Sequence, residues 1–376
     1  MIGLLGFGTV GKGVYEILKG LDDKPAGCEI KSILVSSLDK HKDYDLNFTT
    51  DVERIIQDKE INIVVECTGS DDAYGWLVDS MKSGKSVITA NKAVVSKHFE
   101  ELSRLAEENS VDFLYEASVA GGIPVIKSLS ELILYNEIEY IGGVLNGTSN
   151  FVLTSMPAKT YEEAVKEAQS IGFAEADPSA DVDGIDAMRK LRILATLAFG
   201  YKVEEEEIFT KSISSVDSID ISYMEERNMK VKQLALAVKG DGDYQALVVP
   251  FAIPKESPLA SLEGGENCVF LEGSNVGPLK FIGLGAGMYP TGNAVVSNIY
   301  DVLFGKQFAR NPLANQVQAK ATSPKGKFYL RTVNGLPKEI KGVAKEIKTG
   351  VYETDFIDFS LLKDFKGTVI CMEVEK

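Results

Sequence analysis

Residues 2–11 read IGLLGFGTVG, and this stretch indicates how the first part of the chain folds. A short apolar run leads into Gly6, Gly8 and Gly11, which have the spacing G-x-G-x-x-G, and an amphipathic segment follows. In a dinucleotide-binding fold the first glycine makes a tight turn, the second lets a pyrophosphate approach the backbone, and the third lets the helix pack on the strand. The helix N-terminus then offers free N–H groups and the positive end of its dipole to the phosphates. A lone G-x-G-x-x-G is a weak signal, but its position between a strand and a helix strengthens it. We therefore assign the whole loop to cofactor binding, through Gly6, Phe7, Gly8, Thr9, Val10 and Gly11.

Apolar runs and helical patterns alternate after this loop. The predicted strands lie at 30–36, 61–67, 86–90 and 111–115, and the predicted helices between them lie at 52–57, 76–82 and 99–107. Strands that alternate with helices form a parallel sheet covered on both faces. The pattern predicts an α/β fold whose first domain, residues 1–122, is a Rossmann-type doubly wound dinucleotide domain.

The rest of the chain has a different pattern. Residues 123–285 predict an α+β domain, in which a mixed sheet carries helices on one face. A helix at 286–308 is expected to complete the first domain. Residues 321–376 read as a strand at 328–333, a helix at 337–347 and strands at 351–361 and 368–374, which predicts a small C-terminal βαββ unit.

The composition is that of a packed soluble protein, with 376 residues, 44% apolar residues and a formal net charge of −15. An acidic surface repels phosphate backbones and anionic membranes, so neither a nucleic acid nor a membrane is an expected partner. No apolar run reaches the roughly 18 residues of a membrane span, and no signal peptide is visible, so we expect a cytoplasmic protein. The four cysteines form no CxxC pair, which favours reduced thiols. With only two histidines, a histidine-based zinc or iron site is close to excluded.

Two long motifs carry a resemblance to a known family. Residues 142–151 read GGVLNGTSNF, and residues 172–191 contain GFAEADP followed by DVDGIDAMRKL. Together with ANK at 90–92 and EASVAGGIP at 116–124, they resemble homoserine dehydrogenases over roughly residues 1–305. The resemblance implies reversible NAD(P)-dependent hydride transfer between L-homoserine and L-aspartate 4-semialdehyde, a step in threonine, methionine and isoleucine biosynthesis. It also implies that the domain at 123–285 binds this small-molecule substrate and forms a homodimer or a higher homo-oligomer.

Asp186 and Lys190 lie four residues apart in a predicted helix at 185–199, so they share one helix face. The spacing alone favours a surface salt bridge worth roughly a few tenths of a kcal/mol. The preceding loop, however, crowds further carboxylates at the start of this helix, and the ammonium group of an amino-acid substrate would balance them. The family resemblance assigns Lys190 as the proton donor to the substrate oxygen, with Asp186 holding the substrate and tuning the lysine.

The resemblance also assigns the remaining substrate contacts. Lys92 resembles the second active-site lysine of the family, which contacts both nicotinamide and substrate. Glu175 would receive the substrate ammonium group, and Thr148 and Asp181 are weaker substrate contacts.

The choice between NADP and NAD is open. The second strand ends at Val35-Ser36-Ser37 with Lys40 and Lys42 nearby, and no carboxylate occurs at its tip until Asp39. A carboxylate at the tip would favour NAD, whereas hydroxyl and lysine side chains suit a 2′-phosphate. We therefore assign Ser36 to cofactor binding and expect NADP. Thr68 and Gly69 are expected to border the nicotinamide ribose, and Gly287 either returns to the cofactor or simply opens a helix.

Residues 116–123 resemble the monovalent cation site of the family. Na⁺ or K⁺ would be bound by Glu116 and by the backbone carbonyls of Val119, Gly121 and Ile123, because hard cations prefer oxygen ligands. A glycine-bearing crossover between domains explains the same stretch equally well.

Other interpretations remain open. The C-terminal βαββ unit resembles a truncated ACT domain, and the chain could be a catalytically silent amino-acid or NADP sensor, or a related amino-acid or semialdehyde oxidoreductase. Intact Lys92, Glu175, Asp186 and Lys190 argue against a sensor. A semialdehyde dehydrogenase that forms a thioester needs an activated cysteine, and no cysteine lies in such a motif.

Overall fold

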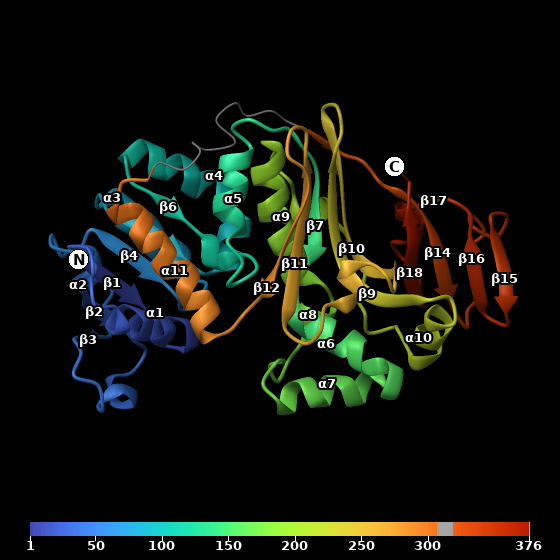
Figure 1. Ribbon diagram of the computed structural model, residues 1–376, viewed down its shortest axis with the longest axis horizontal. Coiled ribbons are helices and arrows are strands. Elements are labelled where there is room, and N and C mark those ends of the chain that lie inside the picture. Colours follow the sequence, from blue (N-terminus) through green and yellow to red (C-terminus); the bar gives the residue numbers. More distant parts are fainter. Residues whose placement is uncertain (307–318, 376) are drawn as a thin grey trace. The chain divides into compact units, whose positions relative to one another are not determined.

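The computed structural model describes residues 1–306 and 319–375, which fold into two compact units (Figure 1). The first unit contains Met1–Asn136, Thr196–Lys202 and the chain from Gly283 to residue 306. The second contains Glu137–Ala195, Val203–Ile282 and the C-terminal residues 319–375. Among the helices of this described part, none is both long and apolar enough to cross a membrane.

The first unit is built on a six-stranded parallel sheet with the order β3-β2-β1-β4-β5-β6. The chain moves outward from β1 to β3 and then returns to the other side of β1, as in a doubly wound fold. The strands are short and apolar because both faces of the sheet are buried. The arrangement confirms the predicted Rossmann-type fold. The bounds are β1 (Ile2–Leu5), β2 (Ile30–Leu34), β3 (Phe48–Thr49), β4 (Ile63–Glu66), β5 (Ser86–Thr89) and β6 (Phe113–Leu114).

Helices cover both faces of this sheet. One apolar cluster joins the sheet to α1 and α11, for example through Val14 and Ile299. A second cluster joins it to α3 and α4, for example through Leu77 and Leu102. The helices that lie within the ranges of the first unit are α1 (Thr9–Gly20), α2 (Glu53–Ile56), α3 (Ala73–Lys82), α4 (Lys92–Asn109), α5 (Val125–Leu132) and α11 (Met288–Leu303).

Two glycines let α1 and α11 approach closely. A Cβ atom on Gly13 would lie 2.2 Å from the carbonyl oxygen of Met288, and one on Gly292 would lie 2.9 Å from the carbonyl carbon of Gly13. Any larger residue at either position would push the helices apart. The helix α11 therefore packs directly on α1, the helix that follows the glycine loop. Residues 307 and 308 of the helix predicted at 286–308 lie outside the described residues.

The second unit contains a mixed 12-stranded sheet. Its central part, β11-β7-β9-β10, is antiparallel, and β18 continues it in parallel with β10. The long order is β12-β11-β7-β9-β10-β18-β14-β16-β15, with β8 and β13 beside β10 and β17 beside β14. The main strands are β7 (Ile138–Val144), β9 (Met229–Lys239), β10 (Asp243–Pro254), β11 (Glu266–Gly273), β12 (Gly277–Leu284), β14 (Lys325–Arg331), β15 (Ala344–Lys348), β16 (Val351–Thr354) and β18 (Thr368–Val374). The short strands are β8 (Phe209–Thr210), β13 (Lys320–Ala321) and β17 (Ile357–Asp358).

Helices pack against the central strands of the second unit. One apolar cluster joins α6, α7 and α10 to β9 and β10, through residues such as Val152, Ala164, Met224, Val231 and Ala252. The helix α7 begins with a capping box, in which Glu163 N donates to Thr160 Oγ1 and Thr160 N donates to Glu163 Oε2. The helices are α6 (Gly147–Ser155), α7 (Tyr161–Ser170), α8 (Ser179–Val182), α9 (Ile185–Phe199) and α10 (Ser218–Glu225).

The predicted C-terminal βαββ unit is wrong in two respects. Residues 337–347 form no α-helix, and 344–348 instead form β15, which pairs antiparallel with β16. The predicted helix had apolar residues at helical spacing, but only Ile340 is fully buried, while Val343 is 39% exposed and Gly342 interrupts the segment. The C-terminal strands also continue the sheet of the second unit, since Cys371 pairs with Phe251 of β10. An ACT-like unit is therefore not supported.

Candidate active site

The glycine loop has the geometry that a bound pyrophosphate requires. Gly6 has a φ of +98°, which favours glycine, and a Cβ atom on Gly11 would lie 2.1 Å from the Gly6 carbonyl oxygen. A Cβ atom on Gly8 would meet nothing within 4 Å, so open space lies beside this backbone. No side chain caps the N-terminus of α1, whose N–H groups are thus available to a phosphate group.

A pocket of about 690 Å³ lies at the carboxyl ends of β1, β2 and β4 in the first unit. Of the predicted cofactor residues it brings together Gly6, Phe7, Gly8, Ser36 and Thr68, and Lys40 also lines it. Thr9, Val10, Gly11, Gly69, Lys92 and Gly287 are not among its lining residues. Lys42 forms an ion pair with Asp39 at 2.7 Å. His41 and Trp76 also line the pocket, and because they belong to no motif, no sequence pattern pointed to them.

Glu66 organises the loop after β4 and was read from sequence only as part of an apolar strand. Its side chain is completely buried. One carboxylate oxygen accepts from Thr68 N and Thr68 Oγ1, both at 2.6 Å, and from Gly69 N at 3.3 Å. The other oxygen accepts from Thr89 Oγ1 at 2.6 Å. This carboxylate therefore fixes the loop that was predicted to border the ribose.

Lys92 lies at the first residue of α4, directly after the carboxyl end of β5. The preceding Asn91 caps the helix, because its side-chain oxygen accepts from Val94 N at 3.2 Å. The amide of Asn91 also donates to Ser70 O at 3.0 Å. Lys92 thus lies at the edge of the sheet where open α/β folds bind ligands.

Asp186 and Lys190 form a buried ion pair in the second unit. Lys190 Nζ lies 2.7 Å from Asp186 Oδ2, and the two side chains are only 10% and 7% exposed. Lys190 Nζ also donates to the carbonyl oxygen of Leu145 at 2.7 Å. Burial rules out the solvated salt bridge that the spacing alone had favoured.

Asn146 joins the two aspartates of the predicted site. Its Nδ2 donates to Asp181 Oδ1 at 2.6 Å and to Asp186 Oδ2 at 2.9 Å, while its Oδ1 accepts from Ser149 N and caps α6. Burial raises the pKa of Asp181, the hydrogen bond from Asn146 lowers it, and the charge of Asp186 raises it again. Asn146 lies in a motif of the resemblance, but only the structure reveals that it holds the carboxylates together.

Two other predicted substrate residues, Thr148 and Glu175, differ in their exposure to solvent. Thr148 is buried, and its hydroxyl donates to Phe173 O at 2.8 Å. Glu175 is exposed, and its backbone carbonyl accepts from Gln169 Nε2. Asp177 accepts from Ser179 N at the start of α8, and the hydrogen bonds from the backbone and side chain of Ser179 lower the pKa of Asp177. Among Glu175, Asp177 and Asp181 of the loop before α9, Asp181 is therefore the residue that Asn146 links to the Asp186–Lys190 pair.

Glu116 is almost completely buried beside the N-terminus of α5. Its two carboxylate oxygens accept from Ile126 N and Lys127 N, each at 2.9 Å. Burial raises its pKa to about 7, although these hydrogen bonds act in the opposite direction. Val119 and Ile123 are buried and Gly121 has a φ of +52°. The part of the chain that the structure describes contains no cluster of three or more His, Cys, Asp or Glu side chains suited to a metal ion.

Comparisons with known proteins place these features in a family. Residues 124–300 match the family model described as homoserine dehydrogenase, and residues 6–116 match the model of its NAD-binding domain. The homoserine dehydrogenase of Bacillus subtilis is 40% identical over 313 residues, which cover 80% of this chain and 72% of that protein. The enzyme of Synechocystis is 42% identical over 315 residues, which cover 80% and 73%.

The chain belongs to the homoserine dehydrogenase family.

Solved homoserine dehydrogenase structures have the same fold. One from Thiobacillus denitrificans is 30% identical with a TM-score of 0.87, covering 99% of this chain and 97% of that one. One from S. aureus is 32% identical with a TM-score of 0.76, covering 100% and 98%. A hyperthermophilic archaeal homoserine dehydrogenase in complex with NADPH is 28% identical with a TM-score of 0.71, covering 82% and 99%.

Homoserine dehydrogenases are oxidoreductases of amino-acid biosynthesis, and this chain is one of them. The silent-sensor interpretation is not favoured. A thioester-forming dehydrogenase is disfavoured by the thiols themselves, because burial raises the pKa of Cys28, Cys67, Cys268 and Cys371. None is therefore activated as a thiolate near neutral pH.

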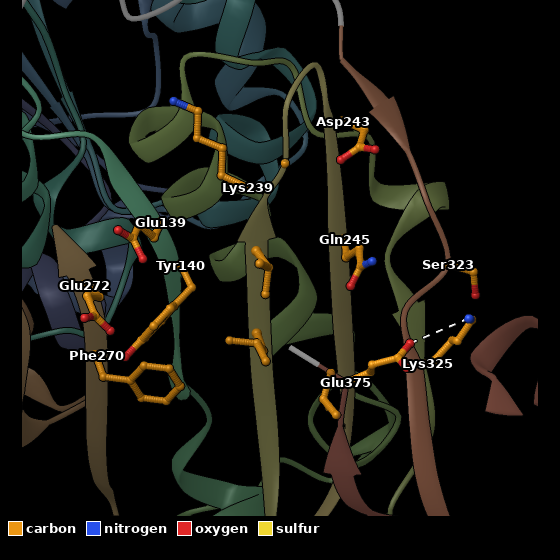
Figure 2. A pocket seen from close by; sticks show the side chains of 14 residues that line it. Glu139, Tyr140, Lys239, Asp243, Gln245, Phe270, Glu272, Ser323, Lys325 and Glu375 are labelled. Atoms are coloured by element: carbon orange, nitrogen blue, oxygen red, sulfur yellow. Dashed lines mark ion pairs between the residues drawn. The ribbon is translucent and has the colours of Figure 1, made fainter. Parts of the chain in front are cut away.

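A larger hollow of about 990 Å³ in the second unit contains none of the predicted site residues (Figure 2). It extends over strands β11, β7, β9 and β10 to β14 and β18, and Tyr140, Leu236, Val238 and Phe270 are among the residues that line it. Its size alone would have suggested a substrate pocket, but its side chains offer no buried acid–base group.

Proposed function

We propose that Lys190 is the proton-transfer group of a reversible homoserine dehydrogenase reaction, in which L-homoserine and L-aspartate 4-semialdehyde interconvert. The observation that carries this proposal is the buried Lys190–Asp186 pair, held at 2.7 Å and tied to the Leu145 carbonyl. A bound nicotinamide cofactor supplies or accepts the hydride. The protein must then manage the proton on the substrate oxygen.

An ammonium group has three N–H donors. Lys190 directs one of these N–H groups at Asp186 Oδ2 and donates another to Leu145 O. The third can therefore face a substrate oxygen. As the aldehyde is reduced, negative charge develops on that oxygen and the proton moves to it from Lys190; oxidation of homoserine reverses this transfer.

Asp186 keeps Lys190 oriented, and Asp181, held beside it by Asn146, supplies negative charge for the substrate ammonium group. Glu175 is exposed on its loop and is proposed as a second contact of the ammonium group. Thr148, whose hydroxyl donates to Phe173 O, is proposed as a weaker substrate contact.

NADP is the proposed cofactor. The glycine loop fits a pyrophosphate, and Ser36 and Lys40 line the same pocket and suit a 2′-phosphate. A solved hyperthermophilic archaeal homoserine dehydrogenase is in complex with NADPH. Lys92, at the start of α4, is proposed to contact the nicotinamide and the substrate, with Gly69 and Gly287 near the cofactor.

Na⁺ or K⁺ is proposed to bind near Glu116 and the carbonyls of Val119, Gly121 and Ile123. A buried carboxylate whose pKa is raised to about 7 is a group that a cation would stabilise in its charged form.

A homodimer or a higher homo-oligomer in the cytoplasm is proposed. The hollow is lined by the apolar and aromatic side chains of Tyr140, Leu236, Val238 and Phe270 and by charged side chains that include Glu139 and Lys239. Figure 2 shows Tyr140 and Phe270 close to Glu139 and Glu272. Such a surface suits a second copy of the chain. The four free cysteines suit a reducing compartment.

The oxidation of NADPH and of NADH by aspartate semialdehyde, followed by absorbance with purified protein, tests the proposal. Turnover with NADPH that is strongly reduced in Lys190→Ala is expected. A folded protein that binds cofactor but turns over neither nicotinamide would contradict it.

A further inference from the structure

The Leu145 carbonyl lies where β7 ends and the cap of α6 begins. The ladder between β7 and β11 includes the pair Val144 and Cys268, so Leu145 and Asn267 are the next residues beyond it. The Leu145 carbonyl accepts from two side chains instead: Lys190 Nζ at 2.7 Å and Asn267 Nδ2 at 2.8 Å.

We propose that Asn267 is a positioning residue for the proton transfer, because it holds the carbonyl that holds Lys190. The inference rests on the proposed role of Lys190. Asn267 belongs to none of the motifs of the resemblance, and it acts on the substrate only through the lysine.

The orientation of the Asn267 amide is determined by its surroundings. The side chain is completely buried, and turning the amide over would place its oxygen against the carbonyl oxygen of Leu145. In the observed orientation, Asn267 Oδ1 has no hydrogen-bond partner among the described residues. Leaving a buried acceptor unpaired costs free energy. An apolar side chain of similar size would avoid this cost, so stability alone does not explain the asparagine.

The second donor restrains the carbonyl. A carbonyl oxygen has two lone pairs, and here both are directed at a donor. Without Asn267, the Leu145 carbonyl could turn toward Lys190 alone, and the ammonium group would shift with it. Proton transfer depends steeply on such small displacements.

A double-mutant cycle tests this role. Asn267→Leu is expected to lower kcat about tenfold, as the loss of one hydrogen bond would, while KM for homoserine and Kd for NADPH stay within about twofold. In the Lys190→Ala background, the same substitution is expected to change kcat less than about twofold, because the group that it positions is gone. If Asn267→Leu does not fold, Asn267→Ala replaces it in the cycle.

Asn136→Leu is the matched control, because Asn136 is also buried and its amide donates to a backbone carbonyl, Leu132 O, at 3.1 Å. It is expected to keep the kcat of the unmodified protein. A wild-type kcat for Asn267→Leu, an effect on KM alone, or an equal loss in both backgrounds would overturn the role of Asn267. A folded Lys190→Ala variant with normal kcat would instead overturn the proposed function of Lys190, and the inference about Asn267 with it.

Discussion

Asn146 Nδ2 lies 2.9 Å from Asp186 Oδ2, so the carboxylate that pairs with Lys190 is also held by the residue that caps α6. The same amide donates to Asp181. Two acidic side chains from different segments are therefore kept together by one neutral donor. Without that donor, they would repel each other in a buried place.

Asn146→Asp should make stability depend on pH. The variant keeps an acceptor for Ser149 N but places a third carboxylate beside Asp181 and Asp186. Mutual repulsion raises the folded-state pKa values of the group, so stability falls as pH rises through the carboxylate range. We expect Tm to drop more at pH 8 than at pH 5. Asn146→Ser keeps a cap and adds no charge, but it removes the amide that donates to Asp181 and Asp186. It is expected to lower Tm with a weaker pH dependence than Asn146→Asp; equal pH profiles for the two variants would contradict this explanation.

Glu116 should give the protein a stability that declines between about pH 4.5 and 7. Its folded-state pKa is raised from 4.5 to about 7, so the folded state keeps a proton that the unfolded state has lost in this window. Glu116→Gln should remove this slope. If a cation binds there, Na⁺ or K⁺ should raise Tm above pH 7 relative to choline, and only with Glu116 present. Identical Tm values in all three salts would argue against the cation site.

Ser36→Asp should shift the cofactor preference toward NAD. A carboxylate at the end of β2 accepts from a ribose 2′-hydroxyl and repels a 2′-phosphate. The ratio of kcat/KM for NADH to that for NADPH should rise by at least about tenfold. Ser37→Asp adds the same charge at a residue that does not line the pocket and should change the ratio less. A native enzyme with strong preference for NADH would show that the expectation of NADP is wrong.

Arg331→Met should destabilise the second unit. Arg331 Nε and NH2 donate to the two oxygens of buried Asp220, at 2.6 and 2.7 Å, and Tyr329 OH donates to the same carboxylate. Removing the guanidinium leaves a buried charge, with an expected cost of about 3 kcal/mol. Lys327→Met breaks the exposed pair with Glu373 and should cost less than about 1 kcal/mol. Urea denaturation measures both, and similar losses would contradict the argument.

Much of the first unit could be predicted because its signals are local. The strands β1, β4 and β5 are apolar runs buried on both faces, and the glycine loop follows from chain sterics. The prediction of a helix at 337–347 was wrong. Apolar residues there have helical spacing, but residues 344–348 form a strand that pairs antiparallel with β16, and no local sequence pattern reveals this pairing.

Some features of the candidate site also follow from local sequence, whereas others depend on the tertiary fold. The spacing of Asp186 and Lys190 placed them on one helix face, but whether the pair was buried depended on the packing of the second unit. Glu66 was hidden in an apolar run, and Asn267 reaches Leu145 only through the register of β7 with β11. These residues act through distant segments, so only the fold exposes them.

Steady-state kinetics of Lys190→Ala, measured beside Glu175→Ala and with folding checked by circular dichroism, show whether Lys190 transfers the proton. Lys190 exchanges a proton as charge develops, so its loss should lower kcat by about 10²- to 10⁴-fold with little change in KM. Glu175 is proposed to hold an ammonium group that is charged throughout, so its loss should chiefly raise KM for homoserine. A folded Lys190→Ala variant with kcat within about threefold of wild type, less than about 1 kcal/mol of barrier, would remove Lys190 from the catalytic mechanism.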